Sequence, residues 1–277
     1  MNKWPHATPE ALPVPKPLYP AGIDPVGVFT RSIQAKRRPT SGDTQKRFNA
    51  QSHRQNLATS SLPMNNRYQI AGAEGEFEPG SNEQVLRNFV GITSPDDMDE
   101  LELRLLGELY DEVLLQNLQD RALTVADLKH WHHLWLGNVY PWAGLTRSVN
   151  LGKGGFQFAA ARLLPGLLDE FERKFLRPWT PCGNLAPDEM VNAIAVTHVE
   201  LIVIHPFREG NGRLSRLLAD VMAVQAGHEP LDYSSWEQQK AAYIGAIHAG
   251  FSGDYGPMRQ FVAEAMAAGD ASLSGPA

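Results

Sequence analysis

The sequence has very little cysteine. Cys182 is the only cysteine among 277 residues, so no disulfide can form within the chain and a zinc site built from several cysteines is excluded. Long apolar runs are also missing, which excludes a membrane-spanning helix. The first residues contain no apolar stretch of the kind found in a secretory signal peptide. We therefore expect a cytoplasmic protein, and a secreted effector that leaves by another route remains the alternative.

Positive and negative charges are unevenly distributed along the chain. Residues 1–67 carry ten Lys and Arg against three Asp and Glu and are rich in Pro, Ser and Asn, whereas residues 68–277 carry fifteen against twenty-eight. Sustained apolar periodicity occurs only in the second part. This pattern predicts a flexible basic tail over 1–67, followed by a folded acidic region. Contact of the tail with nucleic acid stays open, although a solvated tail is the simpler interpretation.

Beyond the tail, the sequence predicts a loop-rich lead-in over 68–94, a helical domain over 95–268 and a disordered C-terminus over 269–277. Thr124 and Asp127 resemble a capping box that starts one of the helices. The segment 190–204 is apolar almost all round, which is typical of a helix in the middle of a core. That helix should end at His205, because Pro206 disfavours helical backbone in the residue before it.

One segment departs from the helical pattern. Residues 146–158 contain two short strand-like runs around a Lys-Gly-Gly turn, which predicts a β-hairpin. The expected fold is therefore an all-α domain interrupted by one small hairpin. Three nearby histidines, His130, His132 and His133, lack a zinc-binding spacing. His198, on the apolar helix, is interpreted as a hydrogen-bonded core residue.

The stretch 205–216, His-Pro-Phe-Arg-Glu-Gly-Asn-Gly-Arg-Leu-Ser-Arg, carries the chemistry. Gly210 and Gly212 let the backbone approach a ligand closely. The amides that open the following helix form an anion site, to which Asn211 can add a donor. Arg213 and Arg216 lie three residues apart, so two guanidinium groups project from neighbouring positions, which suits a polyphosphate.

Two further residues of this stretch, Glu209 and His205, have side chains suited to chemistry on a phosphate. Glu209 is its only acid, and beside phosphates a carboxylate suits Mg²⁺, an ion that usually shares its oxygen ligands with the nucleotide. His205 can accept a proton from a hydroxyl near neutral pH. A base, a metal ligand, an anion cradle and two arginines are the parts of a transfer from a nucleoside triphosphate.

This stretch resembles the signature of the Fic family, His-Pro-Phe-x-Asp/Glu-Gly-Asn-Gly-Arg-x-x-Arg, at every defined position. Residues 140–158 are similar to the Tyr/Trp-Ala-Gly segment and hairpin flap of that family, and residues 250–261 resemble the end of its core. The resemblance covers about residues 75–268 and leaves out the tail.

The resemblance implies an α-helical Fic fold and transfer of AMP from ATP to a Tyr, Ser or Thr hydroxyl of a target protein. It implies that His205 is the general base, that Glu209 holds Mg²⁺ and that Phe207 anchors the loop in the core. The phosphates would be bound by Gly210, Asn211, Gly212, Arg213 and Arg216, with the γ-phosphate on Arg216. The target would be clamped by the flap, at Lys153, Gly154, Gly155 and Phe156.

Two other functions stay open. A Doc-like kinase would transfer the γ-phosphate, but the Doc branch tends to have Ala and Lys in place of Gly210 and Gly212. A nucleotide-dependent binding protein would not need His205 and Glu209. Many Fic proteins carry an inhibitory helix in which Glu follows Ser or Thr by four residues. No Ser or Thr of this sequence is followed four residues later by Glu, so we expect inhibition by a small antitoxin-like partner. An uninhibited enzyme whose expression or delivery is controlled is the alternative. A topoisomerase or a small GTPase is a target by family resemblance only.

Overall fold

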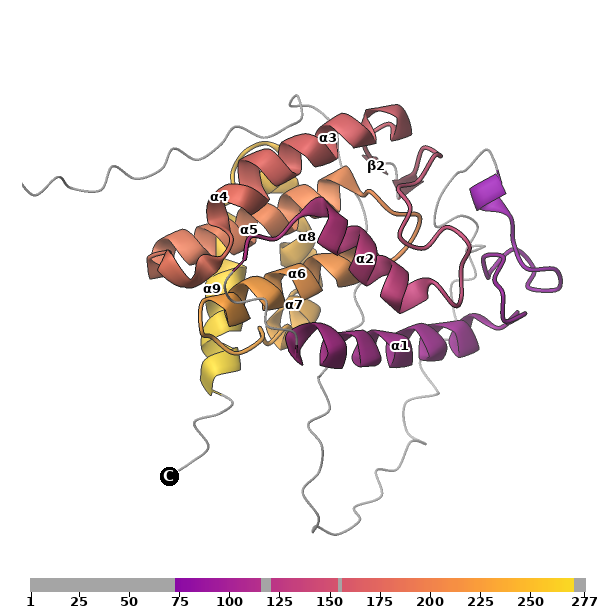
Figure 1. Ribbon diagram of the computed structural model, residues 1–277, viewed down its shortest axis with the longest axis horizontal. Helices are drawn as coiled ribbons and strands as arrows, with labels where there is room; N and C mark the ends of the chain where they lie inside the picture. Colours follow the sequence, from indigo (N-terminus) through magenta and orange to yellow (C-terminus); the bar gives the residue numbers. More distant parts are fainter. Residues whose placement is uncertain (1–72, 116–120, 154–155, 272–277) are drawn as a thin grey trace, which may run out of the picture.

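The computed structural model describes residues 73–115, 121–153 and 156–271. The tail predicted over 1–67, the hairpin tip at Gly154 and Gly155 and the last residues, 272–277, lie outside them. Most of the described residues are helical, as the sequence predicts (Figure 1). The α-helices are α1 (Pro95–Leu115), α2 (Val125–Leu136), α3 (Leu164–Phe171), α4 (Arg177–Trp179), α5 (Pro187–Ile204), α6 (Asn211–Gln225), α7 (Ser234–Gln238), α8 (Lys240–Phe251) and α9 (Gly256–Ala271).

Shorter elements connect these helices. The predicted hairpin is present as an antiparallel pair, β1 (Gly152–Lys153) and β2 (Phe156–Gln157), in which Gly152 lies opposite Gln157. Between α3 and α4 the chain forms one π-helical turn, η3 (Glu172–Leu176), so helical backbone continues from α3 into α4. Three 3₁₀ turns complete the set: η1 (Ala73–Gly75), η2 (Ala161–Leu163) and η4 (Cys182–Asn184).

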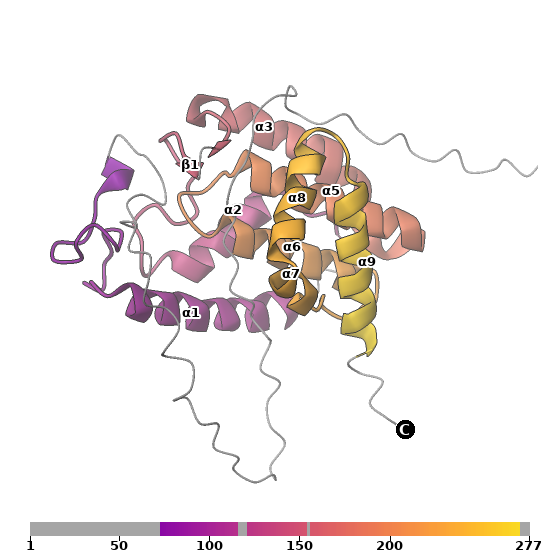
Figure 2. The same ribbon diagram turned by 180° about the vertical axis from the view of Figure 1, so that it is seen from behind.

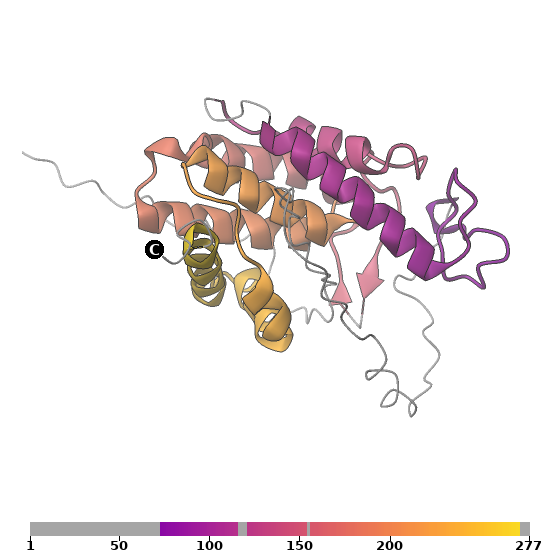
Figure 3. The same ribbon diagram turned by 90° about the horizontal axis from the view of Figure 1, so that it is seen from below.

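Helices α5 and α6 form the centre of the domain. They pack against each other, α1 and α2 contact α6, and α8 and α9 contact α5. Figure 1 shows α1 and α2 on one side of this pair, and Figures 2 and 3 show α8 and α9 on the other. The connection between α5 and α6 is the stretch that the sequence analysis selects, so it is held between two central helices. Among the described residues, no helix is long and apolar enough to cross a bilayer.

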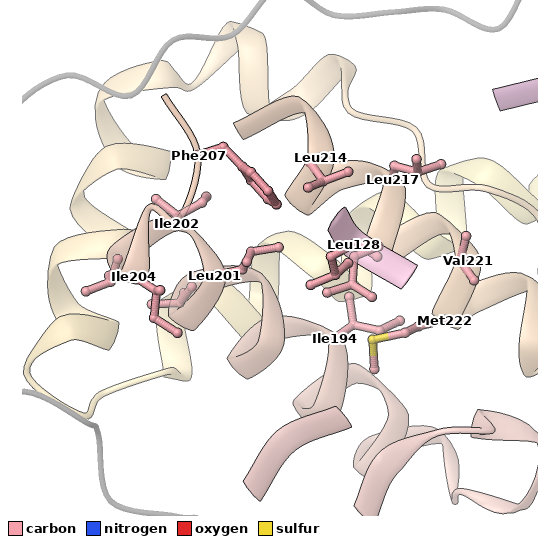
Figure 4. Close-up of a cluster of buried hydrophobic side chains, with 14 of the residues drawn as sticks. Leu128, Ile194, Leu201, Ile202, Ile204, Phe207, Leu214, Leu217, Val221 and Met222 are labelled. Carbon is pink, nitrogen blue, oxygen red and sulfur yellow. The ribbon is translucent and has the colours of Figure 1, made fainter. Parts of the chain in front are cut away.

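The apolar sequence of α5 explains its central position. From Ala193 to Ile204 every residue is buried. Figure 4 shows Ile194 of α5 beside Met222 of α6, and both belong to one buried apolar cluster. The helix ends at His205, as predicted from Pro206. Burial of apolar side chains, as along α5, is the main favourable contribution to folding.

Buried polar groups on α5 find partners in neighbouring helices. His198 Nδ1 lies 3.2 Å from the carbonyl oxygen of Ser215 and its Nε2 lies 2.9 Å from the Tyr243 hydroxyl. Because a carbonyl can only accept, Nδ1 carries the hydrogen and Nε2 accepts from Tyr243. Burial lowers the pKa of His198 to about 3. The interpretation of His198 as a hydrogen-bonded core residue is therefore confirmed.

The predicted capping box of α2 is also present. The Thr124 hydroxyl accepts from the Asp127 amide, and the Asp127 carboxylate accepts from the Thr124 amide at 2.8 Å. We expect Thr124→Ala to lower the free energy of unfolding by about 1 kcal/mol, because it leaves an amide of the first turn without its partner. For a domain of this size, thermal unfolding should then show a Tm about 2–4 °C lower.

Thr93→Ala is the matched control for this change. Thr93 is exposed and precedes α1, so its loss should leave the free energy of unfolding within about 0.5 kcal/mol of the wild-type value. Equal Tm values for the two variants would show that the capping box does not stabilise α2.

Candidate active site

His205 is the residue at which α5 gives way to the connecting loop. Its backbone lies in the left-handed region, with φ 51° and ψ 58°, because Pro206 disfavours right-handed helix in the residue before it. This conformation is unfavourable for a residue with a side chain and persists only where neighbours hold it. Arg147 provides such a contact, since its Nε donates to the His205 carbonyl oxygen at 2.7 Å.

The orientation of the His205 ring follows from its contacts. Nδ1 lies 3.1 Å from the carbonyl oxygen of Ile202, and it must carry the hydrogen because a carbonyl only accepts. The lone pair is therefore on Nε2, the nitrogen that can take a proton from a hydroxyl. Phe158, just after β2, stacks on the ring with a centroid distance of 3.7 Å and an interplanar angle of 14°. The predicted base thus has a defined tautomer and a fixed ring plane.

Phe207 and Asn211 hold the start of the loop. The Phe207 side chain is buried, as expected for an anchor, and stacks on His132 with centroids 4.1 Å apart. Asn211 Oδ1 accepts from the Phe207 amide at 2.9 Å, and Asn211 Nδ2 donates to the Phe207 carbonyl oxygen at 2.9 Å. The Asn211 side chain thus closes the loop, and Nδ2 carries a second hydrogen that suits the predicted donation to a ligand.

The anion cradle is the N-terminus of α6. Gly210 caps the helix with φ 81°, and the first helical bond runs from the Leu214 amide to the Gly210 carbonyl oxygen. The amides of Asn211, Gly212 and Arg213 therefore precede the helical ladder, where amides attract anions. A β-carbon on Gly210 would lie 2.6 Å from a ring carbon of Trp135. Only glycine fits this position without a shift of the buried Trp135.

Arg213 has a carboxylate partner that the sequence analysis does not identify. Its Nη2 lies 2.7 Å from Oε2 of Glu102 on α1, and its guanidinium lies over the Trp135 ring at 4.5 Å. Glu102 is buried and also accepts from the Tyr140 hydroxyl at 2.8 Å. Although burial opposes its charge, the carboxylates of Glu102 and Glu209 raise the pKa of Arg213. The guanidinium stays charged at the helix N-terminus.

Arg216, one turn further along α6, contacts a different helix. Its Nη2 lies 3.3 Å from Oε1 of Glu237 on α7, and its guanidinium lies over the rings of Tyr233 and Trp236. The segment around Glu237 lacks the inhibitory pattern that the sequence analysis sought, yet a carboxylate of the same chain meets this arginine. Both arginines are thus held at the start of α6, each against its own acid and aromatic ring.

Glu209 lies in the loop directly before Gly210, and its Oε1 accepts from the Gly210 amide at 3.2 Å. Among the described residues, no three His, Cys, Asp or Glu side chains form a group that could hold a metal ion. Mg²⁺ often takes only one or two carboxylates and completes its shell with phosphate oxygens and water. A single carboxylate beside an anion cradle fits an ion shared with a nucleotide.

Arg147 is a buried residue of the site that sequence reasoning missed. Besides His205, it donates to the carbonyl oxygens of Val149 at 2.7 Å and Ala159 at 2.5 Å, which flank the hairpin on either side. It therefore ties the hairpin, whose Lys153 and Phe156 pair as β1 and β2, to the end of α5. A lone arginine in a predicted hairpin gives no signal that distinguishes it from a solvated charge.

Comparison with known proteins identifies the family of this chain. The model of the Fic/DOC family matches residues 122–223. "Probable protein adenylyltransferase y4lH" of Sinorhizobium fredii is 31% identical over 184 residues, which cover 65% of this chain and 89% of that protein. The chain belongs to the Fic/DOC family. "Protein adenylyltransferase Fic" of Drosophila melanogaster is 32% identical over 202 residues, but the matched part is only 39% of that longer protein.

Solved structures of Fic domains share the fold. The Bartonella tribocorum effector BepC, with bound AMPPNP, has a TM-score of 0.55 at 22% identity, and the match covers 65% of this chain and 91% of that one. A Fic domain from Bartonella quintana with bound ADP has the same TM-score at 22% identity and covers 65% and 89%. The Fic fold expected from the sequence is confirmed.

The position of Gly210 in this Fic/DOC loop yields a testable expectation. We expect Gly210→Ala to lower the free energy of unfolding by about 1–2 kcal/mol, because alanine disfavours positive φ, and the clash with Trp135 should add to this. ATP binding, measured by calorimetry, should weaken in the same variant.

Gly107→Ala provides the control, because its new β-carbon meets no atom within 4 Å and the residue lies inside α1. That change should raise the free energy of unfolding by about 0.5–1 kcal/mol. If Gly210→Ala were as stable as Gly107→Ala and bound ATP normally, the close packing of the cradle on Trp135 would be refuted.

Proposed function

We propose that the protein transfers AMP from ATP to a hydroxyl side chain of a target protein, with His205 as general base. Its relatives named protein adenylyltransferase support AMP transfer to a protein in general. The observation that carries the residue roles is the tautomer of His205, whose Nδ1 donates to Ile202. That contact makes Nε2 the basic nitrogen of a ring that lies at the end of α5, where the loop leads into the proposed anion cradle.

In the proposed step, the target hydroxyl loses its proton to Nε2 of His205 while its oxygen attacks the α-phosphorus of ATP. A bond forms between that oxygen and the α-phosphorus, and the bond from this phosphorus to the β-phosphate oxygen breaks. The products are the adenylylated hydroxyl, pyrophosphate and a protonated imidazole, which then loses its proton to water. General-base catalysis commonly contributes about 10²–10⁴-fold to such a step.

The start of α6 would bind the phosphates. The amides of Asn211, Gly212 and Arg213 precede the helical ladder, and the guanidinium groups of Arg213 and Arg216 lie on the same helix. Charge-assisted hydrogen bonds from such donors are shorter and stronger than neutral ones. We assign Arg213 to the inner phosphates and Arg216 to the γ-phosphate.

Glu209 would hold Mg²⁺ together with the phosphates of the nucleotide. When bound there, the ion would neutralise phosphate charge that builds up during the transfer. Glu209 itself is positioned by the amide of Gly210, so its carboxylate stays beside the cradle.

The hairpin would dock the target. Backbone groups of a short hairpin can pair with an extended segment of another protein by strand addition. The bonds from Arg147 to both sides of the hairpin and to His205 would keep a docked segment in register with the base. We assign Lys153, Gly154, Gly155 and Phe156 to this contact.

A Doc-like kinase is the alternative reaction. Alanine, which the Doc branch tends to have in place of Gly210, would place its β-carbon 2.6 Å from Trp135 in this chain. The glycines at 210 and 212, in place of the Ala and Lys of the Doc branch, favour AMP transfer over γ-phosphate transfer, and the packing on Trp135 explains why position 210 keeps glycine.

We also propose that this activity is toxic, that a small antitoxin-like partner inhibits it in trans, and that the protein acts in the bacterial cytoplasm. The Bartonella neighbours are described as VirB-translocated effectors, so a secreted effector is the alternative. The basic tail over 1–67 is proposed to be a separate flexible segment.

Replacement of the base tests the proposed function. We expect wild-type protein, incubated with Mg²⁺, ATP and a cell lysate, to add an adenylyl mass to a lysate protein. His205→Ala should reduce the rate about 10²–10⁴-fold, as followed by intact-mass spectrometry. His130→Ala, which removes an exposed histidine of α2, should leave the rate unchanged.

Each other result has a defined meaning. A phosphoryl mass would assign the kinase reaction, and full activity of His205→Ala would remove His205 from the chemistry. If purified protein bound ATP but modified nothing in several lysates, the nucleotide-dependent binding function would replace the enzymatic one.

The proposed role of Arg216 gives a second test. We expect Arg216→Gln to weaken ATP binding about tenfold or more, since a hydrogen bond to a charged group contributes about 1.5–3 kcal/mol, and to change AMP binding much less. Calorimetric titration of both nucleotides measures the difference. Arg177→Gln is the control, because Arg177 also pairs with a glutamate, Glu172, at 2.8 Å but on the exposed surface. Equal weakening of ATP and AMP binding would contradict a contact with the γ-phosphate.

A further inference from the structure

We propose that His132 of α2 is a positioning residue that locks the peptide between Glu209 and Gly210 in the orientation that nucleotide binding requires. The inference rests on the proposed function, because it concerns the same loop. His132 is fully buried, and 77 residues separate it from Glu209, the residue whose carbonyl oxygen it contacts at 3.1 Å through Nε2.

The contacts of His132 assign its tautomer. The Gly144 amide donates to Nδ1 at 2.8 Å, so Nδ1 carries the lone pair and Nε2 carries the hydrogen. Nε2 therefore donates to the Glu209 carbonyl oxygen. One neutral imidazole accepts from the segment after α2 and donates to the loop before α6. Both ring nitrogens are used by backbone groups, so the ring is available neither for zinc nor as a base.

Aromatic packing fixes the plane of the His132 ring. Phe207 stacks on it with centroids 4.1 Å apart and an interplanar angle of 8°, and Trp135 meets it at 77°. The backbone of Phe207 is held in turn by two hydrogen bonds with the Asn211 side chain, one donated by the Phe207 amide and one by Asn211 Nδ2. The donor on Nε2 consequently points at a single place, the Glu209 carbonyl oxygen.

The peptide plane transmits this constraint to the site. In a trans peptide the carbonyl of one residue and the amide of the next point in opposite directions. Because the Glu209 carbonyl faces His132, the Gly210 amide faces away from it, and there it donates to Oε1 of Glu209 at 3.2 Å. His132 thus sets the direction of the amide that positions the proposed Mg²⁺ ligand. Gly210 has a positive φ, and glycine adopts many backbone conformations easily. Without the bond from His132, the peptide between Glu209 and Gly210 could therefore turn over.

Two substitutions separate the two hydrogen bonds of His132. In His132→Gln the amide nitrogen can take the place of Nε2 and keep the bond to Glu209, whereas in His132→Asn the amide oxygen can take the place of Nδ1 and keep the bond from Gly144. We expect His132→Asn to weaken binding of ATP with Mg²⁺ about tenfold and His132→Gln to retain affinity within about threefold. The exposed His130→Asn is the matched control.

The measurement is calorimetric titration with ATP, with and without Mg²⁺, together with a Tm for each variant. The stimulation of ATP binding by Mg²⁺ should fall in His132→Asn alone, a difference that general destabilisation would not produce. The inference is overturned if folded His132→Asn matches the wild type, or if His132→Gln is as weak as His132→Asn. Failure of the wild type to bind ATP would refute the proposed function instead.

A measurement on the wild type decides the case in which His132→Asn does not fold. Nuclear magnetic resonance of protein with ¹⁵N-labelled histidine reports which nitrogen of each ring carries the hydrogen. We expect His132 to be protonated at Nε2 and unprotonated at Nδ1, before and after addition of ATP with Mg²⁺. A hydrogen on Nδ1 would overturn the inference, because Nε2 could then not donate to Glu209.

Discussion

The geometry of the site depends on the hydrogen bonds that the buried guanidinium of Arg147 donates to backbone carbonyl oxygens. The last carbonyls of a helix have no partner within the helix, and an unpaired carbonyl inside a protein is costly. Arg147 solves this for the end of α5 by donating to His205, and it donates at the same time to Val149 and Ala159 beside the hairpin. Its own amide donates to the Pro206 carbonyl oxygen at 2.9 Å. A rigid, planar fork of donors can serve several carbonyls at once, which the single ammonium of lysine cannot do in the same geometry. The hairpin and His205, the proposed base, are therefore fixed relative to each other.

The loop between α5 and α6 is held by polar contacts at both of its ends, although its sequence is rich in glycine. Asn211 closes the end at Phe207, and His132 bonds to the end at Glu209. Each such bond contributes only about 1 kcal/mol net, but breaking one leaves a buried group without its partner, which costs more. The glycine residues thus permit an unusual backbone, and the surrounding side chains select one form of it. The preorganised cradle depends as much on α2 as on the loop itself.

Local features were predictable from the sequence, and long-range pairs were not. The cap at Thr124, the end of α5 before Pro206 and the hairpin around Lys153 all follow from rules that involve neighbouring residues. Arg147, His132 and Glu102 meet partners 58, 77 and 111 positions away, and nothing in a single sequence marks such pairs. Arg213 and Arg216 combine a local feature that the sequence predicts with long-range partners that it does not. Their spacing correctly places them as neighbours at the start of α6, but it says nothing of the acids that hold them.

Those two acids make the arginines physically different. Glu102 is buried, so moving Arg213 away from it would leave a carboxylate without compensation, which is strongly unfavourable. Arg213 uses Nη2 for Glu102, and its fork has further donors for a phosphate, so it can bind an anion without leaving its partner. Glu237 is more exposed, with 29% of its side chain accessible, and its contact with Arg216 is longer at 3.3 Å. Glu237 can therefore regain water when it leaves this contact, whereas Arg216, with 6% of its side chain accessible, needs another anion in its place. Under the proposed function, Arg213 would therefore be a fixed cation of the cradle, whereas Arg216 would exchange its carboxylate for the terminal phosphate of the nucleotide, the contact that would distinguish a triphosphate from its products.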